Sequence, residues 1–329
     1  MSDELVIISP EIAAGSGGVA DYTLRLVEEW ESRVRPRLVL PNEFKSNFRA
    51  DKILLQYSAY GFDRLGYPGK FLRALIDWKK TARGLLVIMF HEIWAFWPFW
   101  NKNWLVQLQH RRHLGKLIAL ADAVFTSTPS QAEHLRKLVP QCHPQVMPVG
   151  SNVRRTVPDD AKRDAGRGIV FGLQSGRIRT LCKFSHLPSV ITKVVTFGAQ
   201  NTSTGDKEES ELLQGLRLTS GYEMRGALAE GEVSELLGTA EFALSAQDEL
   251  SLTKSGTFMA CAAHGLNIIS PAADSLGAEP VCWLTSPAEL INGISPNELN
   301  SRAENLRAWQ ERTSSWPMIA ERFAEALRL

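Results

Sequence analysis

The residues with the clearest potential for chemistry stand late in the chain, where Ser255, Gly256 and Thr257 precede the small-residue segment 258–263. If that segment is a helix, its first backbone N–H groups lack intrahelical partners and lie at the positive end of the helix dipole. Anions bind readily there, the hydroxyls add donors, and the glycine admits a close approach. The pattern predicts a phosphate-binding helix N-terminus, and an ordinary capped core helix is the alternative.

A second glycine-rich segment follows the first apolar run, with Gly15, Gly17 and Gly18. Gly15, Gly17 and Ala20 formally match the G-x-G-x-x-A pattern of dinucleotide-binding folds. Two observations weaken this match. The glycines stand several residues past the strand, and the second expected strand, 37–41, does not end in the acid that would bind a ribose. An NAD-dependent oxidoreductase is therefore the less favoured alternative.

His91 and Glu92 close the apolar run 85–90. This run predicts a buried strand, and ligands of open α/β sheets bind at the carboxyl ends of strands. A histidine there can donate a hydrogen bond to a ligand hydroxyl or orient a nucleophile. A lone histidine is also common as a structural residue, but its position at a strand end favours function.

The segment 93–104 is unusually aromatic, and it includes Trp94 and Trp97. Aromatic faces stack on sugars and also lie at membrane interfaces. Basic residues follow that would favour an anionic lipid surface: Lys102, Arg111, Arg112 and Lys116. A tryptophan-rich packing loop with a solvated basic helix face is the alternative.

Short β-branched runs alternate with amphipathic segments along all 329 residues, which indicates an α/β protein of two domains. The net charge of +1 argues against a nucleic-acid partner, and four scattered cysteines favour reduced thiols and a cytoplasmic location. The N-terminus does not resemble a signal peptide, and no window is apolar enough to cross a bilayer.

The expected elements follow from these runs. Strands are predicted at 5–9, 37–41, 53–56, 85–90, 123–127 and 145–148, and helices at 21–30, 69–81, 103–120 and 129–139. After a charged linker at 148–167, strands are predicted at 168–172, 190–197 and 240–245, with a helix at 232–238. The segment 174–179 is expected as a loop, and the polar segment 201–210 as a mobile one.

These pieces together resemble the retaining glycosyltransferases of the GT-B architecture, of the family-four type (glycosyl transferases group 1). The similarity is carried by segments spread over most of the chain: 15–29, 121–138, 148–152, 226–246, 255–270 and 314–327. The resemblance implies two facing Rossmann-like domains, an acceptor domain at 1–160 and a donor domain at 161–305, with a C-terminal helix at 306–329 returning to the first.

The resemblance also implies an activity. Such enzymes move a sugar from a nucleotide diphosphate sugar, here a UDP- or GDP-sugar, to a carbohydrate or lipid-linked acceptor in glycan or glycoconjugate biosynthesis. They retain the anomeric configuration and hold no permanent cofactor. The chain shows no metal-ligand motif, so a metal-independent enzyme is expected. Peripheral contact of the protein with the inner face of a membrane is a further expectation.

Site residues are implied by matching positions. Donor contacts are expected from Gly17, Gly18, Arg177, Arg179, Lys183, Glu249, Ser255, Gly256 and Thr257, with Arg177 and His91 as catalytic residues. Acceptor contacts are expected from Asp21, Tyr22, Glu92, Trp94 and Trp97. The family commonly has two glutamates in an E-x7-E arrangement, and Leu252 and Ala260 occupy those positions here. This departure makes an inactive, nucleotide-binding or scaffold homologue the main alternative.

Overall fold

The computed structural model describes residues 4–13, 17–63, 68–93, 104–158, 161–184, 186–199 and 201–329. The chain divides into two compact units: Met1–Val149 with Ser314–Leu329, and Gly150–Thr313. The second unit begins earlier than the expected residue 161 because the preceding segment packs on it. Thr156 N–H donates to Ser234 Oγ (2.9 Å), and Val157 lies directly against Gly238.

Sheet A of unit 1 has, among the described residues, six parallel strands. In spatial order they are β2 (Arg37–Val39), β1 (Leu5–Ile8), β3 (Lys52–Ser58), β4 (Leu85–Glu92), β5 (Ala123–Thr126) and β6 (Gln145–Val146). The helices of this unit are α1 (Gly18–Trp30), α2 (Ala59–Phe62), α3 (Gly69–Ala82), α4 (Trp104–Leu120), α5 (Pro129–Leu138) and α12 (Trp316–Leu327). The strands and helices expected in this half of the chain are confirmed.

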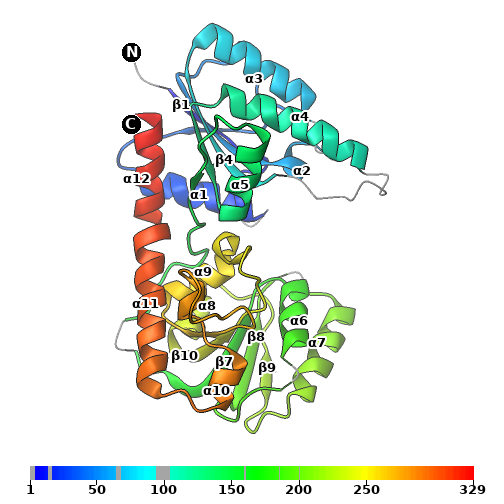
Figure 1. Cartoon of the computed structure of the whole chain (residues 1–329), viewed down its shortest axis with the longest axis vertical. Coiled ribbons are helices and arrows are strands. Elements are labelled where there is room, and N and C mark those ends of the chain that lie inside the picture. Colours follow the sequence, from blue (N-terminus) through cyan, green and yellow to red (C-terminus); the bar gives the residue numbers. More distant parts are fainter. Residues whose placement is uncertain are drawn as a thin grey trace. The chain divides into compact units, whose positions relative to one another are not determined.

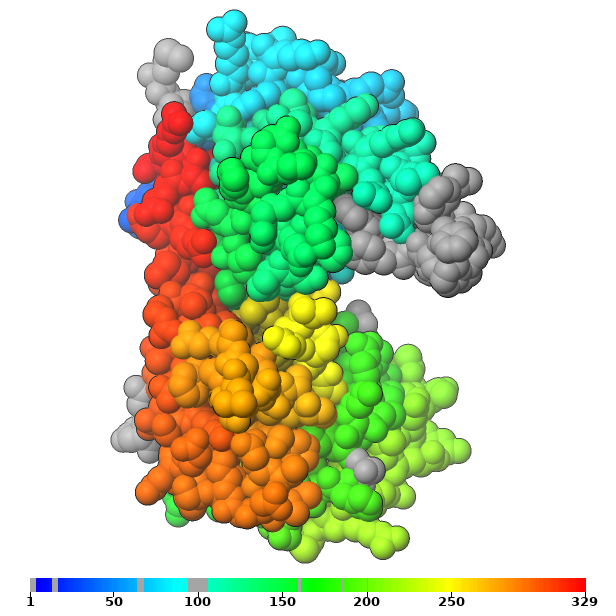
Figure 2. All heavy atoms as spheres, in the orientation of Figure 1, coloured from blue at the N-terminus to red at the C-terminus, as the bar shows by residue number. Residues whose placement is uncertain are grey.

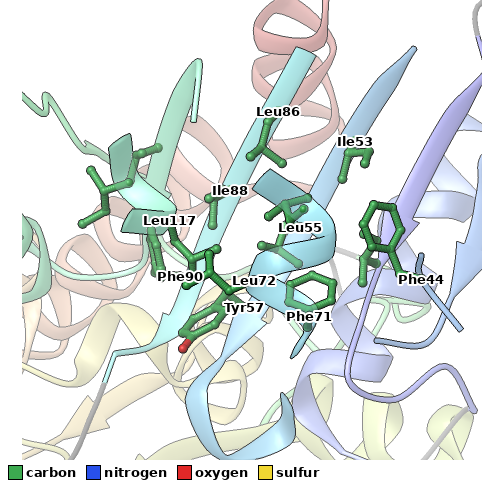
Figure 3. Packing of buried hydrophobic residues seen from close by; sticks show 14 of the residues in the cluster. Phe44, Ile53, Leu55, Tyr57, Phe71, Leu72, Leu86, Ile88, Phe90 and Leu117 are labelled. Carbon is green, nitrogen blue, oxygen red and sulfur yellow. The ribbon is translucent and has the colours of Figure 1, made fainter. Parts of the chain in front are cut away.

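One face of sheet A is covered by α3 and α4. Alternate residues of β3 and β4, such as Ile53, Leu55 and Ile88, form one apolar cluster with side chains of these helices, among them Phe71 and Leu117 (Figure 3). Side chains in a strand point alternately to the two faces, so the residues between them must face the other way. Buried parallel strands therefore read as continuous apolar runs, as here.

The other face of sheet A carries α1 and α12. Although α12 comes from the C-terminus, it packs against α1, β3 and β4 within unit 1 (Figure 1). Phe323 of α12 meets Phe125 of β5 edge-to-face at 5.0 Å, and Trp30 Nε1–H donates to Ala320 O at 3.0 Å. The chain thus returns to its first unit, as the resemblance implied.

Sheet B of unit 2 has, among the described residues, five parallel strands. Their spatial order is β11 (Asn267–Ile269), β10 (Ala240–Leu244), β7 (Asp164–Phe171), β8 (Lys193–Phe197) and β9 (Tyr222–Met224). Its helices are α6 (Gln174–Lys183), α7 (Ser203–Gly215), α8 (Glu230–Thr239), α9 (Gly256–Ala263), α10 (Pro287–Ile291) and α11 (Pro296–Ser314), with 3₁₀ turns η1 (Leu252–Lys254) and η2 (Val281–Trp283). The strand and helix expectations for this half are confirmed.

Two loop predictions are wrong. Residues 174–179 belong to α6, and most of the polar segment 201–210 lies in α7. Thr202 caps α7 by accepting from Gly205 N–H, and Glu209 is fully buried against Arg177 of α6. The low apolar content was misleading because α7 is held by buried polar contacts with α6 rather than by an apolar stripe alone.

Candidate functional site

The strand order of sheet B identifies the edge of the sheet at which a ligand is expected to bind. From β7 the chain winds through β8 to β9 on one side, and then crosses to β10 and β11 on the other. The helices that follow β7 and β10 therefore diverge, and open α/β sheets bind ligands at the crevice outside the carboxyl ends of two such strands. Gly172 follows β7, and Ser255, Gly256 and Thr257 follow the loop after β10.

These two loops meet. A methyl group built on Gly172 would lie 3.3 Å from Thr257 Cγ2, so Thr257 at the start of α9 borders the space beside this glycine. A methyl group on Gly256 would lie 3.2 Å from Asn152 Cβ, which places the segment after unit 1 at the same edge. The expected helix N-terminus is confirmed and lies at the switch point of sheet B.

The start of α9 has the geometry of a capped N-terminus. Ser255 is the N-cap, and its hydroxyl accepts from Phe258 N–H at 3.2 Å. The hydroxyls of Ser255 and Thr257 are 3.1 Å apart, and residues 255–257 are half-exposed, whereas 258–262 are buried. The helix thus buries its small residues and presents its polar first turn.

Arg177 holds the neighbouring loop in place. Its guanidinium donates to both oxygens of Glu209 (2.8 and 2.9 Å), to Gly172 O (2.7 Å) and to Asn201 Oδ1 (2.9 Å). Gly198 packs so closely on Gly172 that a side chain at 198 would meet Gly172 O at 1.9 Å, and its φ is +139°. The β7–α6 and β8–α7 loops are therefore locked together at the switch point.

This arrangement differs from the expected basic pair. Arg177 is 1% exposed and its guanidinium is engaged by protein acceptors, so it is not presented to a ligand. Arg179 and Lys183 follow Arg177 by two and six residues. On a helix of 3.6 residues per turn both positions lie on the side of α6 opposite Arg177, and both side chains are exposed. The structure does not bring the three cations together.

The positions that align with the E-x7-E glutamates lie in the core. Leu252 and Ala260 are both fully buried, so neither position faces solvent. Glu249 is exposed in the loop between β10 and η1, at the same edge of the sheet as α9. Its donor-binding role stays a prediction. Among the described residues, no three histidine, cysteine, aspartate or glutamate side chains form a group that could hold a metal ion.

In unit 1, a β-bulge shapes the end of β4. Tyr57 of β3 pairs with Phe90, and the next residue, Ser58, pairs with Glu92, so His91 is the extra residue. Bulges bend a strand and redirect a side chain, and they are frequent beside active sites. His91 Nε2 lies 2.7 Å from Gln56 Oε1 on the adjacent strand. Since that oxygen only accepts, this assignment puts the ring proton on Nε2.

Polar and aromatic groups surround His91 on the α1 face. The ring of Tyr22 meets His91 edge-on at 4.8 Å and Trp316 at 5.0 Å. Burial lowers the pKa of His91 to about 4 and raises that of Tyr22 well above its usual range. The Tyr22 hydroxyl and Gln56 Nε2 are buried and have no hydrogen-bond partner within the described residues. His91 is therefore neutral at pH 7 and lies beside two buried polar atoms with unused bonding capacity.

The remaining predicted residues of unit 1 are placed as follows. Glu92 is exposed and accepts from Ser58 Oγ at 3.2 Å. Gly17 is the N-cap of α1, with Gly18 in its first turn, and Asp21 N–H donates to Gly17 O. The structure thus places the Gly17–Gly18 pair at a helix N-terminus. Trp94 and Trp97 lie outside the described residues.

Several residues at these edges were missed from sequence. Gln131 of α5 donates to His91 O (3.2 Å) and accepts from Thr126 Oγ1. These two hydrogen bonds hold the backbone of the bulge against α5 and β5. Gln56, Glu209 and Asn152 were not singled out either. Gln56 alone carried a signal, as a polar residue inside an otherwise apolar run at 53–57. The others become neighbours of the site only through contacts distant in sequence.

The free energy of unfolding should fall on acidification, because two histidines are buried in their neutral form. His91 and His264 both have pKa values of about 4 because burial disfavours the imidazolium. The unfolded chain takes up these protons near pH 6.5 and the folded protein does not, so the free energy of unfolding decreases as pH falls from 6.5 to 4. At pH 4.5 the loss is about 2.5 kcal/mol for each histidine.

Urea unfolding at pH 7 and pH 4.5 measures this effect. His91→Gln and His264→Gln should each show a smaller difference between the two pH values than the wild type. An unchanged difference in a variant would contradict the burial of that histidine as a neutral group.

Comparisons with known proteins bear on the fold. No protein-family model matches the chain, and no curated protein matches it. Among solved structures, AviGT4, a glycosyltransferase involved in avilamycin A biosynthesis, is 13% identical with a TM-score of 0.52, covering 99% of this chain and 97% of that one. T4 phage BGT, in complex with UDP and Mn²⁺, is 14% identical with a TM-score of 0.51, covering 99% and 100%.

A second kind of enzyme shares the architecture. A putative UDP-N-acetylglucosamine 2-epimerase from Listeria monocytogenes is 10% identical with a TM-score of 0.55, covering 99% of this chain and 96% of that one. At these identities the likeness concerns the fold. The chain has two α/β units with parallel sheets, and its C-terminal helix α12 belongs to the first unit. Together with these similarities over nearly its full length, this architecture shows that the chain has the GT-B fold.

Proposed function

We propose that this protein is a glycosyltransferase that takes a sugar from a nucleoside diphosphate sugar and transfers it to an acceptor hydroxyl. The observation that carries the proposal is the first turn of α9, where half-exposed Ser255, Gly256 and Thr257 lie at the switch point of sheet B, with Thr257 bordering the space beside Gly172. Solved proteins of the same fold support it, since BGT was solved with UDP and the rhamnosyltransferase SpnG with thymidine diphosphate.

On the donor side, the diphosphate is held at the start of α9. Backbone N–H groups of the first turn and the hydroxyls of Ser255 and Thr257 supply donors, and the dipole of α9 stabilises charge on the departing diphosphate. Gly172 keeps the opposite wall free of a side chain. Arg177 acts as a positioning residue, because it fixes the carbonyl of Gly172 and Asn201 rather than meeting the ligand.

On the acceptor side, His91 is the central residue. Its neutral ring, held by Gln56 and Tyr22, orients the acceptor hydroxyl or a hydroxyl of the transferred sugar. Asp21 and Glu92 are proposed as further acceptor contacts. Retention of configuration, a UDP- or GDP-linked donor, a metal-independent reaction and a role in glycan or glycoconjugate synthesis are proposed from the family resemblance.

Calorimetric titration with UDP, GDP, ADP, TDP, their common sugar conjugates and NAD tests the donor site. Thr257→Val removes one hydroxyl without changing the shape of the side chain, and it should weaken binding of the preferred nucleotide about ten- to a hundredfold, the effect of losing a hydrogen bond to a charged group. Thr253→Val is the matched control. Thr253 lies just upstream, and its buried hydroxyl has no partner in the described part of the chain.

The outcomes separate the alternatives. Equal binding by wild type and Thr257→Val would show that the nucleotide does not use the start of α9. Binding of NAD alone would overturn the glycosyltransferase proposal. Binding without turnover would favour an inactive homologue, and conversion of a bound nucleotide sugar to its 2-epimer without an acceptor would favour an epimerase, the second activity seen among similar folds.

A further inference from the structure

The outer surface of α3 and α4 is strongly basic. The two helices pack against each other on one face of sheet A, and they form one continuous surface of unit 1 (Figures 1 and 2). Six exposed cations lie on it: Lys70, Arg73, Lys80, Arg111, Arg112 and Lys116. The sequence of these two helices contains a single acid, Asp77. We name these six residues the α3–α4 surface.

Helix periodicity places these charges away from the core. Phe71, Leu75 and Trp78 bury the inner stripe of α3, so Arg73 and Lys80 lie on its opposite side. On α4, Leu114 and Leu117 are buried, and Arg112 and Lys116 are exposed one turn apart. The cations thus point outward from the same layer of the unit.

Asp77, four residues after Arg73 and three before Lys80, is the one acid on these two helices, so the surface keeps a net positive charge. Within the described ranges, no hydrogen bond or ion pair engages any of the six side chains. Two exposed lysines on other helices do have an acid one turn away, Lys137 with Glu133 on α5 and Lys207 with Glu211 on α7. Arg112 and Lys116, in contrast, repel each other across one turn, and like charges at that spacing destabilise a helix. An anionic partner would offset this cost.

We propose that the α3–α4 surface binds the anionic headgroups of a lipid bilayer. The proposed contact is with the surface of the bilayer; no helix in the described residues is long and apolar enough to cross a membrane. A rigid pair of helices with outward lysines and arginines matches the negative surface potential of a leaflet rich in acidic lipids.

Aromatic residues favour lipid over other polyanions. Tyr60 of α2 is 45% exposed beside α4, with its ring 5.8 Å from that of His110. The sequence that leads into α4 contains tryptophans at positions 94, 97, 100 and 104. Tyrosine and tryptophan are enriched at membrane interfaces, where one end of the ring is apolar and the other is hydrated.

Co-sedimentation with vesicles tests the proposal. The full-length protein should bind vesicles of phosphatidylcholine with 30% phosphatidylglycerol at low salt, and bind pure phosphatidylcholine vesicles at least tenfold more weakly. Each cation near an anionic surface strengthens binding about fivefold, so Arg112→Gln with Lys116→Gln should lower the partition coefficient about twenty-five-fold. Arg73→Gln with Lys80→Gln is an independent second variant on the other helix.

The matched control is Lys137→Gln with Lys207→Gln, which removes the same charge from exposed positions elsewhere and should leave vesicle binding unchanged. Thermal melting should be the same for all variants, and nucleotide binding should match the wild type, which separates this surface from the donor site. Equal binding to both kinds of vesicle, or wild-type binding by both α3 and α4 variants, would overturn the proposal. Binding of an oligonucleotide through these residues, without vesicle binding, would also overturn it.

Discussion

Glu209→Ala should destabilise unit 2 by about 3–5 kcal/mol. Glu209 and Arg177 are 0% and 1% exposed, so removing the carboxylate leaves a buried guanidinium without its counter-charge. Arg177 also donates hydrogen bonds to Gly172 O and Asn201 Oδ1. A more mobile Arg177 should hold this loop less firmly, so the fraction of the variant that folds should bind nucleotide more weakly. Urea unfolding gives the first quantity and calorimetry the second.

Two controls make this prediction specific. The double variant Arg177→Met with Glu209→Leu replaces both charges by apolar groups and should recover most of the stability, since buried ion pairs gain little over well-packed apolar side chains. Glu211→Ala removes a carboxylate from an exposed pair on the same helix and should have no measurable effect. A loss below about 1 kcal/mol for Glu209→Ala would contradict the buried pair.

His91→Ala should lower the rate of sugar transfer about a hundredfold, because a reacting hydroxyl displaced by about 1 Å from its productive position loses that factor. The affinity for the nucleotide should change little, because the proposed diphosphate site belongs to the other unit. The measurement is release of nucleoside diphosphate from the nucleotide sugar selected by calorimetry, with a panel of glycosides as acceptors.

The control for this prediction is a second buried histidine. His264 lies in unit 2, where Nδ1 donates to Ala260 O and Nε2 accepts from Ser234, so its bonding capacity is used within the fold. His264→Gln should leave the rate of transfer unchanged. A normal rate in His91→Ala would remove His91 from the reaction and leave it as a packing residue under α1.

Local sequence patterns determined most of the elements. The run 85–90 predicted β4 because a strand buried on both faces needs apolar side chains at every position. The small residues after Ser255 predicted α9 and its capped start, because the cap is formed by a side chain and an N–H group three residues apart. Such contacts lie within a few residues, so the sequence reveals them directly.

Tertiary structure decided which of these elements form a site. Arg177 was expected to face a ligand, and only the fold shows that it is buried against a carboxylate 32 positions away. His91 was expected at a strand end, but the bulge that redirects it depends on its register with β3. The polar residues of α7 predicted a loop because their partners on α6 are not adjacent in sequence.

The difference between the features that the sequence determined and those that the tertiary structure decided has a physical reason. Caps, turns and periodicity depend on neighbours along the chain, so the sequence alone determined the α/β elements, the glycine loops and the polar start of α9. Strand order, register and buried ion pairs depend on contacts between distant residues, whose free energy exists only when the whole core is assembled. The switch point of sheet B, the environment of His91 and the structural role of Arg177 were therefore decided by the tertiary structure.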